Sequence, residues 1–175
     1  MKPVYKGMII ALLHVMIVSS LACKLLYDRA NRPRVWALAA PYDPDLPIRG
    51  RYVRIQLEVE PRDIKEPAKT GRWSPSQPAV LRAEGGKLVA APHSDTTRYD
   101  SDAARVQFVE RQNRKLVVLE QPVAFFIPEH VPDPSRRAEG EQLWVEVTLP
   151  RKGPPRPIQL GVKKGDGPIV PLGLN

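Results

Sequence analysis

The sequence has little of the chemistry that enzymes and metalloproteins commonly use. Its 175 residues include one cysteine and three histidines, and aromatic residues make up only 6%. A single cysteine excludes a disulfide within the chain. Only His93 and His130 lie beyond the N-terminal apolar segment, which excludes a His-rich transition-metal site built from this chain alone. We therefore identify no catalytic or metal-binding residue from motifs, and we expect no cofactor.

Acidic residues are also in short supply relative to basic ones. The chain carries 27 Lys and Arg against 19 Asp and Glu, a formal net charge of +8. Nucleic-acid-binding proteins usually concentrate such charge in one patch or interleave it with exposed aromatic residues. Here the tightest basic groups are pairs, Arg136-Arg137, Arg151-Lys152 and Lys163-Lys164. This spread argues against nucleic acid as a partner.

Proline is abundant, and no amphipathic helix is evident beyond the N-terminus. The 20 prolines argue against long interior helices and for short strands joined by stiff loops. Apolar residues alternate or form short runs in eight segments: 35–39, 52–59, 106–109, 116–119, 124–127, 143–149, 158–162 and 169–172. We therefore expect an all-β domain over residues 34–175, a compact antiparallel sandwich or partly open barrel of eight to ten short strands.

The N-terminal segment is the longest apolar run. Met8 to Cys23 carries no formal charge, and Met8 to Tyr27 as a helix is about 30 Å long, enough to cross the hydrocarbon core of a bilayer. We expect residues 1–27 to be a transmembrane anchor that contacts lipid through residues 7–27. Residues 28–33 would then form a linker to the β domain.

Processing at Cys23 is the alternative to an uncleaved anchor. Ser20 and Ala22 are small, as signal peptidase cleavage before Cys23 requires, and Leu21-Ala22-Cys23 loosely resembles a lipoprotein site. A good lipoprotein site, however, has a large aliphatic residue where Ser20 stands. The apolar pattern also resumes at Leu25-Leu26-Tyr27, which favours a spanning helix. Cleavage or lipidation at Cys23 stays open.

Charge around the apolar segment bears on orientation. The short N-terminal tail has Lys2 and Lys6, whereas the downstream flank has Lys24, Arg29, Arg32 and Arg34. Counted literally, this favours a cytoplasmic β domain. A short tail ahead of a first apolar segment is nevertheless the layout of an export signal. We expect a single-pass protein of the cytoplasmic membrane with its C-terminal domain in the cell envelope, periplasmic or extracellular.

A stiff, proline-rich stretch precedes the strand over residues 52–59. Pro41, Pro44 and Pro47 hold residues 40–48 extended, and Gly50 allows a turn into the strand. In that strand Val53, Ile55, Leu57 and Val59 share the apolar face, while Tyr52, Arg54, Gln56 and Glu58 share the other.

The same stretch carries a family resemblance. Ala40-Pro41-Tyr42-Asp43-Pro44-Asp45, followed by Arg49-Gly50-Arg51-Tyr52-Val53-Arg54-Ile55, resembles the signature of the bacterial GDYXXLXY family of membrane-anchored proteins. Phe126-Ile127-Pro128-Glu129 resembles the second landmark of that family. The resemblance implies an uncleaved anchor, an exported β-rich domain of uncharacterised function, and a multi-span membrane protein as partner. Arg51 departs from it, because the family has an aspartate there.

Two functions are open from these residues. The first is a non-enzymatic, membrane-tethered module that binds a membrane protein or envelope component. Its candidate binding residues are Asp43, Asp45, Arg51, Tyr52, Arg54 and Glu129. The alternative is an envelope hydrolase whose site is assembled from scattered acids such as Asp43, Asp45 and Glu129. A deep pocket joining the acids would favour the hydrolase, and a shallow exposed rim the binding module.

Overall fold

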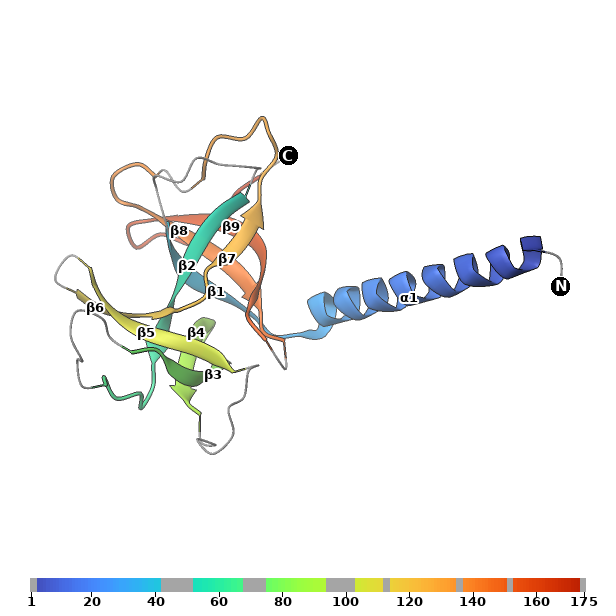
Figure 1. The fold of residues 1–175 in the computed structure, drawn as a ribbon. Helices are drawn as coiled ribbons and strands as arrows, with labels where there is room; N and C mark the ends of the chain where they lie inside the picture. The colour runs from blue at the N-terminus through green and yellow to red at the C-terminus, as the bar shows by residue number, and fades with distance from the viewer. Residues whose placement is uncertain are drawn as a thin grey trace. The chain divides into compact units, whose positions relative to one another are not determined.

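The computed structural model describes residues 3–41, 52–67, 75–93, 103–111, 114–134, 137–150 and 153–173. The chain divides into two compact units, Met1–Arg32 and Pro33–Asn175. The first contains the single helix α1 and the second, called here the β domain, contains the strands (Figure 1). Each unit is described by itself.

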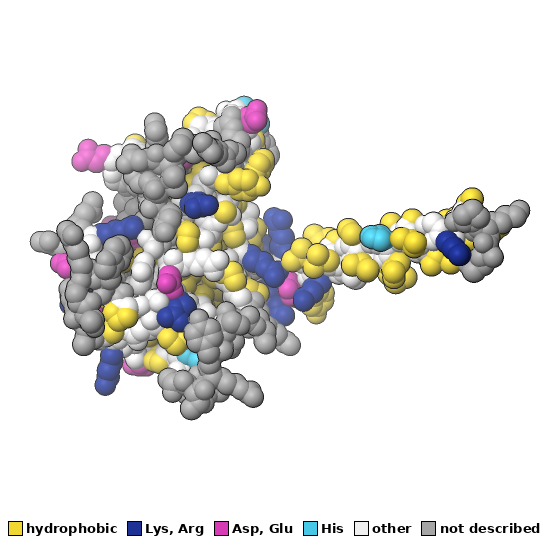
Figure 2. All heavy atoms as spheres, viewed as in Figure 1, with side chains coloured by type: hydrophobic (Ala, Val, Ile, Leu, Met, Phe, Trp, Pro, Cys, Tyr) yellow, Lys and Arg dark blue, Asp and Glu magenta, His cyan; other side chains and the backbone are white. Residues whose placement is uncertain are grey.

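Helix α1 spans Pro3–Asn31 and is apolar on all sides. Val4–Asn31 is long and apolar enough to cross a membrane, with a hydropathy of 2.2 in its most apolar window and none of that window buried. Figure 2 shows hydrophobic side chains along its whole length. Near its end Arg32 forms an ion pair with Asp28 at 3.2 Å, and Pro33 follows, which cannot continue the helical hydrogen bonding.

The described part of the β domain contains ten strands. They are β1 (Arg34–Pro41), β2 (Tyr52–Pro61), β3 (Gln77–Glu84), β4 (Lys87–Pro92), β5 (Ala104–Arg111), β6 (Arg114–Leu119), β7 (Val123–Phe126), β8 (Glu141–Thr148), β9 (Arg156–Lys164) and β10 (Val170–Pro171). All belong to one sheet, so the domain is all-β as the sequence predicts. Strand β5 pairs with β6 and β9 pairs with β10, both antiparallel, and Gly165-Asp166-Gly167 lies between β9 and β10.

Strand β2 is the centre of the sheet, because its two halves pair with different strands. Its first half pairs with β7 on one side and β1 on the other. Its last residues pair with β6 and β4. The pairings β2–β4–β3–β5–β6–β2 close into a circuit of five strands, whereas β7, β2, β1, β8, β9 and β10 form an open series (Figure 1). The result is a partly open barrel.

The core confirms the predicted face of β2. Val53, Ile55 and Leu57 are 6%, 0% and 0% exposed, and they belong to the same buried cluster as Val145 and Val147 of β8. Period-two alternation predicts this face correctly because one side of the strand is packed against the opposite sheet wall.

The β3–β4 hairpin is not among the segments that alternation predicts. Its turn is Gly85-Gly86, with φ of 57° and 78°, values that favour glycine and suit a two-residue hairpin turn. Strand β4 also forms two short parallel pairings, Trp36↔Lys87 with β1 and Glu60↔Val89 with β2. The expected pairing was antiparallel throughout, and side-chain alternation carries no information on strand direction.

Candidate functional site

Three of the six predicted binding residues lie in the described part of the chain. Tyr52 and Arg54 are on β2, and Glu129 is in the turn that follows β7. Asp43, Asp45 and Arg51 lie outside the described residues, as do Gly50 and most of the proline-rich stretch. The binding role of these three residues therefore stays a prediction.

Tyr52 forms an exposed aromatic pair that the sequence did not predict. It lies directly across from Phe126 of β7 in the sheet register, and the two rings pack edge to face with centroids 5.5 Å apart and an interplanar angle of 68°. Tyr52 is 56% exposed and Phe126 60% exposed. Two large hydrophobic side chains so exposed on adjacent strands make an apolar contact surface, and aromatic residues are enriched where proteins bind one another.

Arg54 and Glu129 lie close to this aromatic pair along the chain. Arg54 follows Tyr52 on the same exposed face of β2 and is opposite Ala124 of β7. Glu129 is exposed in the turn closed by a hydrogen bond from the Val131 backbone N–H to the Pro128 carbonyl. Within the described ranges neither Arg54 nor Glu129 has an ion-pair partner. We call Tyr52, Arg54, Ala124 and Phe126 the aromatic patch.

Further along β2, the same face becomes buried and polar. Gln56 is 3% exposed; its side-chain Nε2 donates to the Leu119 carbonyl at 3.2 Å, and its Oε1 accepts from Arg111 Nη2 at 2.8 Å. Burial raises the pKa of the neighbouring Glu58 carboxyl above its usual range, while the positive charges of Arg111 and Arg114 act in the opposite direction. This end of the face is a polar network within the fold.

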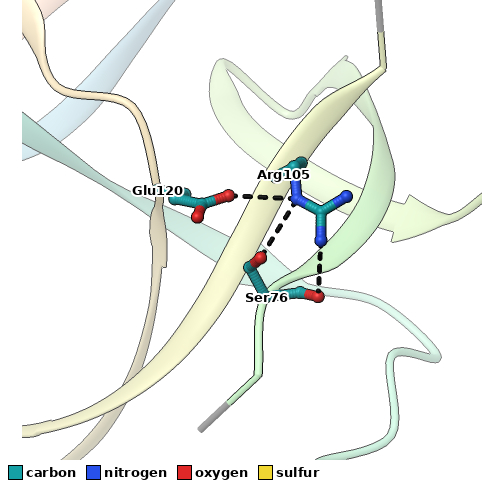
Figure 3. Close-up of polar contacts among 3 residues, drawn as sticks. All are labelled: Ser76, Arg105 and Glu120. Carbon is teal, nitrogen blue, oxygen red and sulfur yellow. Dashed lines mark hydrogen bonds and ion pairs between the residues drawn. The ribbon is translucent and has the colours of Figure 1, made fainter. Parts of the chain in front are cut away.

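A separate cavity of about 390 Å³ lies at the ends of β5 and β6. It is lined by Ala103, Ala104, Arg105, Leu119, Glu120, Gln121, Gly153, Pro154 and Pro155. Arg105 Nε donates to both Ser76 Oγ at 3.0 Å and Glu120 Oε2 at 3.1 Å, and Nη2 donates to the Ser76 carbonyl at 3.1 Å (Figure 3).

The contacts of Arg105 beside this cavity do not supply Ser76 with a base. Ser76 Oγ accepts from a guanidinium, which cannot take up a proton and so cannot act as its base. The Arg105–Glu120 ion pair neutralises its own charge, and both side chains are close to half exposed. Sequence reasoning missed these three residues. Arg105 and Glu120 carry only the weak signal of charges at the start of one strand and just after the next.

The described residues offer little to a metal or to an acid–base pair. Among them there is no group of three or more His, Cys, Asp or Glu side chains placed to hold a metal ion. Glu129 is an exposed carboxylate, and the cavity at β5 and β6 does not include it. Comparisons with protein-family models, with curated proteins and with solved structures gave no match.

Proposed function

We propose that this chain is a membrane-anchored, non-enzymatic module whose β domain binds a membrane protein or envelope component. The proposal rests mainly on the aromatic patch. Tyr52 and Phe126 expose more than half of their surface on adjacent strands, and Arg54 extends the patch with a cation. Such a combination of rigid aromatic side chains and arginine is typical of residues that contribute most to protein binding.

Three further points support this proposal. Helix α1 has the length and composition of a membrane span, and no part of its most apolar window is buried within the chain. The resemblance to the GDYXXLXY family supports an exported domain and a multi-span membrane protein as the partner. The side chains at β2 and β7 are also exposed, Tyr52 at 56% and Phe126 at 60%, which favours a binding module over a hydrolase that needs an enclosed site.

Crosslinking in native membranes tests the binding surface. Tyr52→Ala and Phe126→Ala are each expected to abolish co-purification of the crosslinked partner, while the unfolding free energy changes by no more than about 1 kcal/mol, the usual contribution of an exposed cross-strand pair. The control is Val170→Ala, because Val170 is also 60% exposed but lies on β10 at the other end of the sheet. Equal partner recovery from all three variants would contradict the proposal.

Orientation needs its own measurement. A reporter that is active only outside the cytoplasm, fused after Asn175, is expected to be active. An N-terminal sequence of the mature protein that begins at Cys23 would replace the uncleaved anchor by a processed form. A reporter active only in the cytoplasm would reverse the proposed topology.

A further inference from the structure

His14 lies inside the apolar segment of α1. Large and exposed apolar side chains lie within about one turn of it, including Ile10, Leu13 and Val18 at 56%, 53% and 67%. At 1.5 Å per residue, His14 is about 10 Å along the helix axis from Gly7, and therefore well inside the hydrocarbon layer if the segment from Gly7 to Tyr27 spans it. Polar side chains at such depth are costly unless they have a partner.

One ring nitrogen of His14 is already satisfied within the helix. Nδ1 lies 2.8 Å from the backbone carbonyl oxygen of Ile10. A carbonyl oxygen can only accept a hydrogen bond, so Nδ1 must carry the proton. A neutral imidazole has one N–H, and Nε2 then presents a lone pair with no donor. Ser20 differs, because its hydroxyl donates to the Ile17 carbonyl at 2.8 Å and needs nothing from outside the helix.

Lipid tails carry no hydrogen-bond donor, so the Nε2 lone pair needs one from protein. We propose that His14 Nε2 accepts a hydrogen bond inside the bilayer from a donor-bearing side chain on a transmembrane helix of a partner protein. Helix α1 is then a binding element as well as an anchor. The inference rests on the proposed membrane span of α1 and deepens it by naming the partner as a membrane-embedded helix with a hydroxyl, amide or amine group.

A second copy of the chain is a poor occupant of this position. Two copies with the same hydrogen bond to Ile10 would bring two Nε2 lone pairs together, and neither could donate. If one copy moves its ring proton from Nδ1 to Nε2, it can donate one hydrogen bond to the other ring. That copy then loses its own hydrogen bond to the Ile10 carbonyl oxygen. A second copy of α1 therefore gives no net gain in hydrogen bonds, whereas a helix of another protein that carries a donor gives one more. Ala11 and Gly7 lie on the same side of the helix as His14, about one and two turns away, and leave room for a close approach of backbones.

The test uses the full-length protein with a donor fluorophore on Cys23, its sole cysteine. Cys23 is nine residues from His14 and hence about half a turn around the helix, so the label stays off the His14 face. The protein is reconstituted in phosphatidylcholine vesicles at low density with an acceptor-labelled polyleucine transmembrane peptide that carries one central asparagine. The matched peptide has leucine at that place.

Energy transfer is expected to give an association constant about three- to thirtyfold larger for the asparagine peptide, the range of interhelical hydrogen bonds in bilayers. His14→Leu should remove this discrimination, His14→Gln should retain part of it through the amide oxygen, and Ser20→Ala should leave it unchanged. Equal association with both peptides, or discrimination that survives in His14→Leu, overturns the inference. Stronger transfer between two labelled copies than to the asparagine peptide also overturns it.

Membrane insertion is measured in the same vesicles by resistance of the protein to alkaline extraction. A chain that is extracted overturns both the proposed anchor and the role of His14. A chain that stays inserted but does not discriminate between the peptides overturns the role of His14 alone. Neither outcome bears on the aromatic patch, whose test depends on substitutions in the β domain.

Discussion

The two faces of β2 share one backbone but have opposite surroundings. On the odd-numbered face Val53, Ile55, Leu57 and Val59 are all buried in one apolar cluster. The even-numbered face begins with the exposed Tyr52 and Arg54 and then passes through the buried Gln56 to the half-buried Glu58. The odd face therefore contributes stability through packing. The even face changes along its length from a surface that can meet a partner to a polar network that other strands cover.

The largest effect should come from the odd face. Leu57→Ala is expected to lower the unfolding free energy of the β domain by about 2–5 kcal/mol, because Leu57 is 0% exposed and its truncation leaves a cavity. Chemical denaturation of the full-length protein in detergent measures the change. Leu13→Ala is the control, since Leu13 is exposed on α1 and should alter unfolding of the β domain by less than about 0.5 kcal/mol. A loss below about 1 kcal/mol for Leu57→Ala would mean that the core is loosely packed there.

The next largest effect on the unfolding free energy is expected on the even-numbered face of β2, at the buried Gln56. Gln56→Ala is expected to cost about 1–3 kcal/mol, because it leaves the Leu119 carbonyl and Arg111 Nη2 without their hydrogen bonds to Gln56. Arg54→Ala, two residues earlier on the same face, removes an exposed side chain and should cost less than about 0.5 kcal/mol. Denaturation midpoints of the two variants compare them directly. Equal losses would remove the distinction between the two ends of this face.

The smallest effect depends on pH. Because burial raises the pKa of Glu58 in the folded state, the folded protein binds that proton more tightly than the unfolded chain does. Ionised Glu58 therefore destabilises the fold above its raised folded-state pKa. This penalty disappears as the pH falls through that pKa toward the unfolded value near 4.5. Glu58→Gln should thus be more stable than the unsubstituted protein at neutral pH, by under about 1 kcal/mol because water still screens a half-buried group.

Thermal unfolding across pH 3 to pH 8 would measure the difference between Glu58→Gln and the unsubstituted protein. The two should converge at the acidic end, where Glu58 is protonated in both states. Glu129→Gln removes one negative charge at an exposed position and controls for the change in net charge. A Glu58→Gln variant that is less stable than the unsubstituted protein at neutral pH would show that attraction to Arg111 and Arg114 outweighs burial.

The sequence predicts the elements whose pattern is local. Alternation from Val53 to Val59 identifies the buried face of β2 because burial on one side of a strand imposes a period of two. Strand β3 escapes the same reasoning, because Ala79 is its only fully buried residue and its charged and small residues do not alternate clearly. The all-β class follows from composition and turns, whereas the shared position of β2 depends on pairings between strands distant in the sequence.

The candidate binding surfaces also depend on contacts between strands that are distant in the sequence. Tyr52 was predicted as a binding residue, but its partner Phe126 is brought beside it only by the register between β2 and β7. Arg105 meets Ser76 because β3 pairs with β5, with Gln77 opposite Val106, across 29 positions of sequence. No local pattern encodes that contact, since side-chain periodicity describes faces of strands and not which strands become neighbours.

The shared position of β2 also has a consequence for how the β domain opens. A single uninterrupted backbone forms a wall of the closed five-strand circuit and a wall of the open series. If β2 separates from either the closed circuit or the open series, the backbone amide groups and apolar core of the other part become exposed as well. Strands such as β5 and β8, which do not pair with each other, should therefore exchange their protected amide hydrogens with one common opening free energy. The described strands of the β domain are in this sense a single cooperative unit.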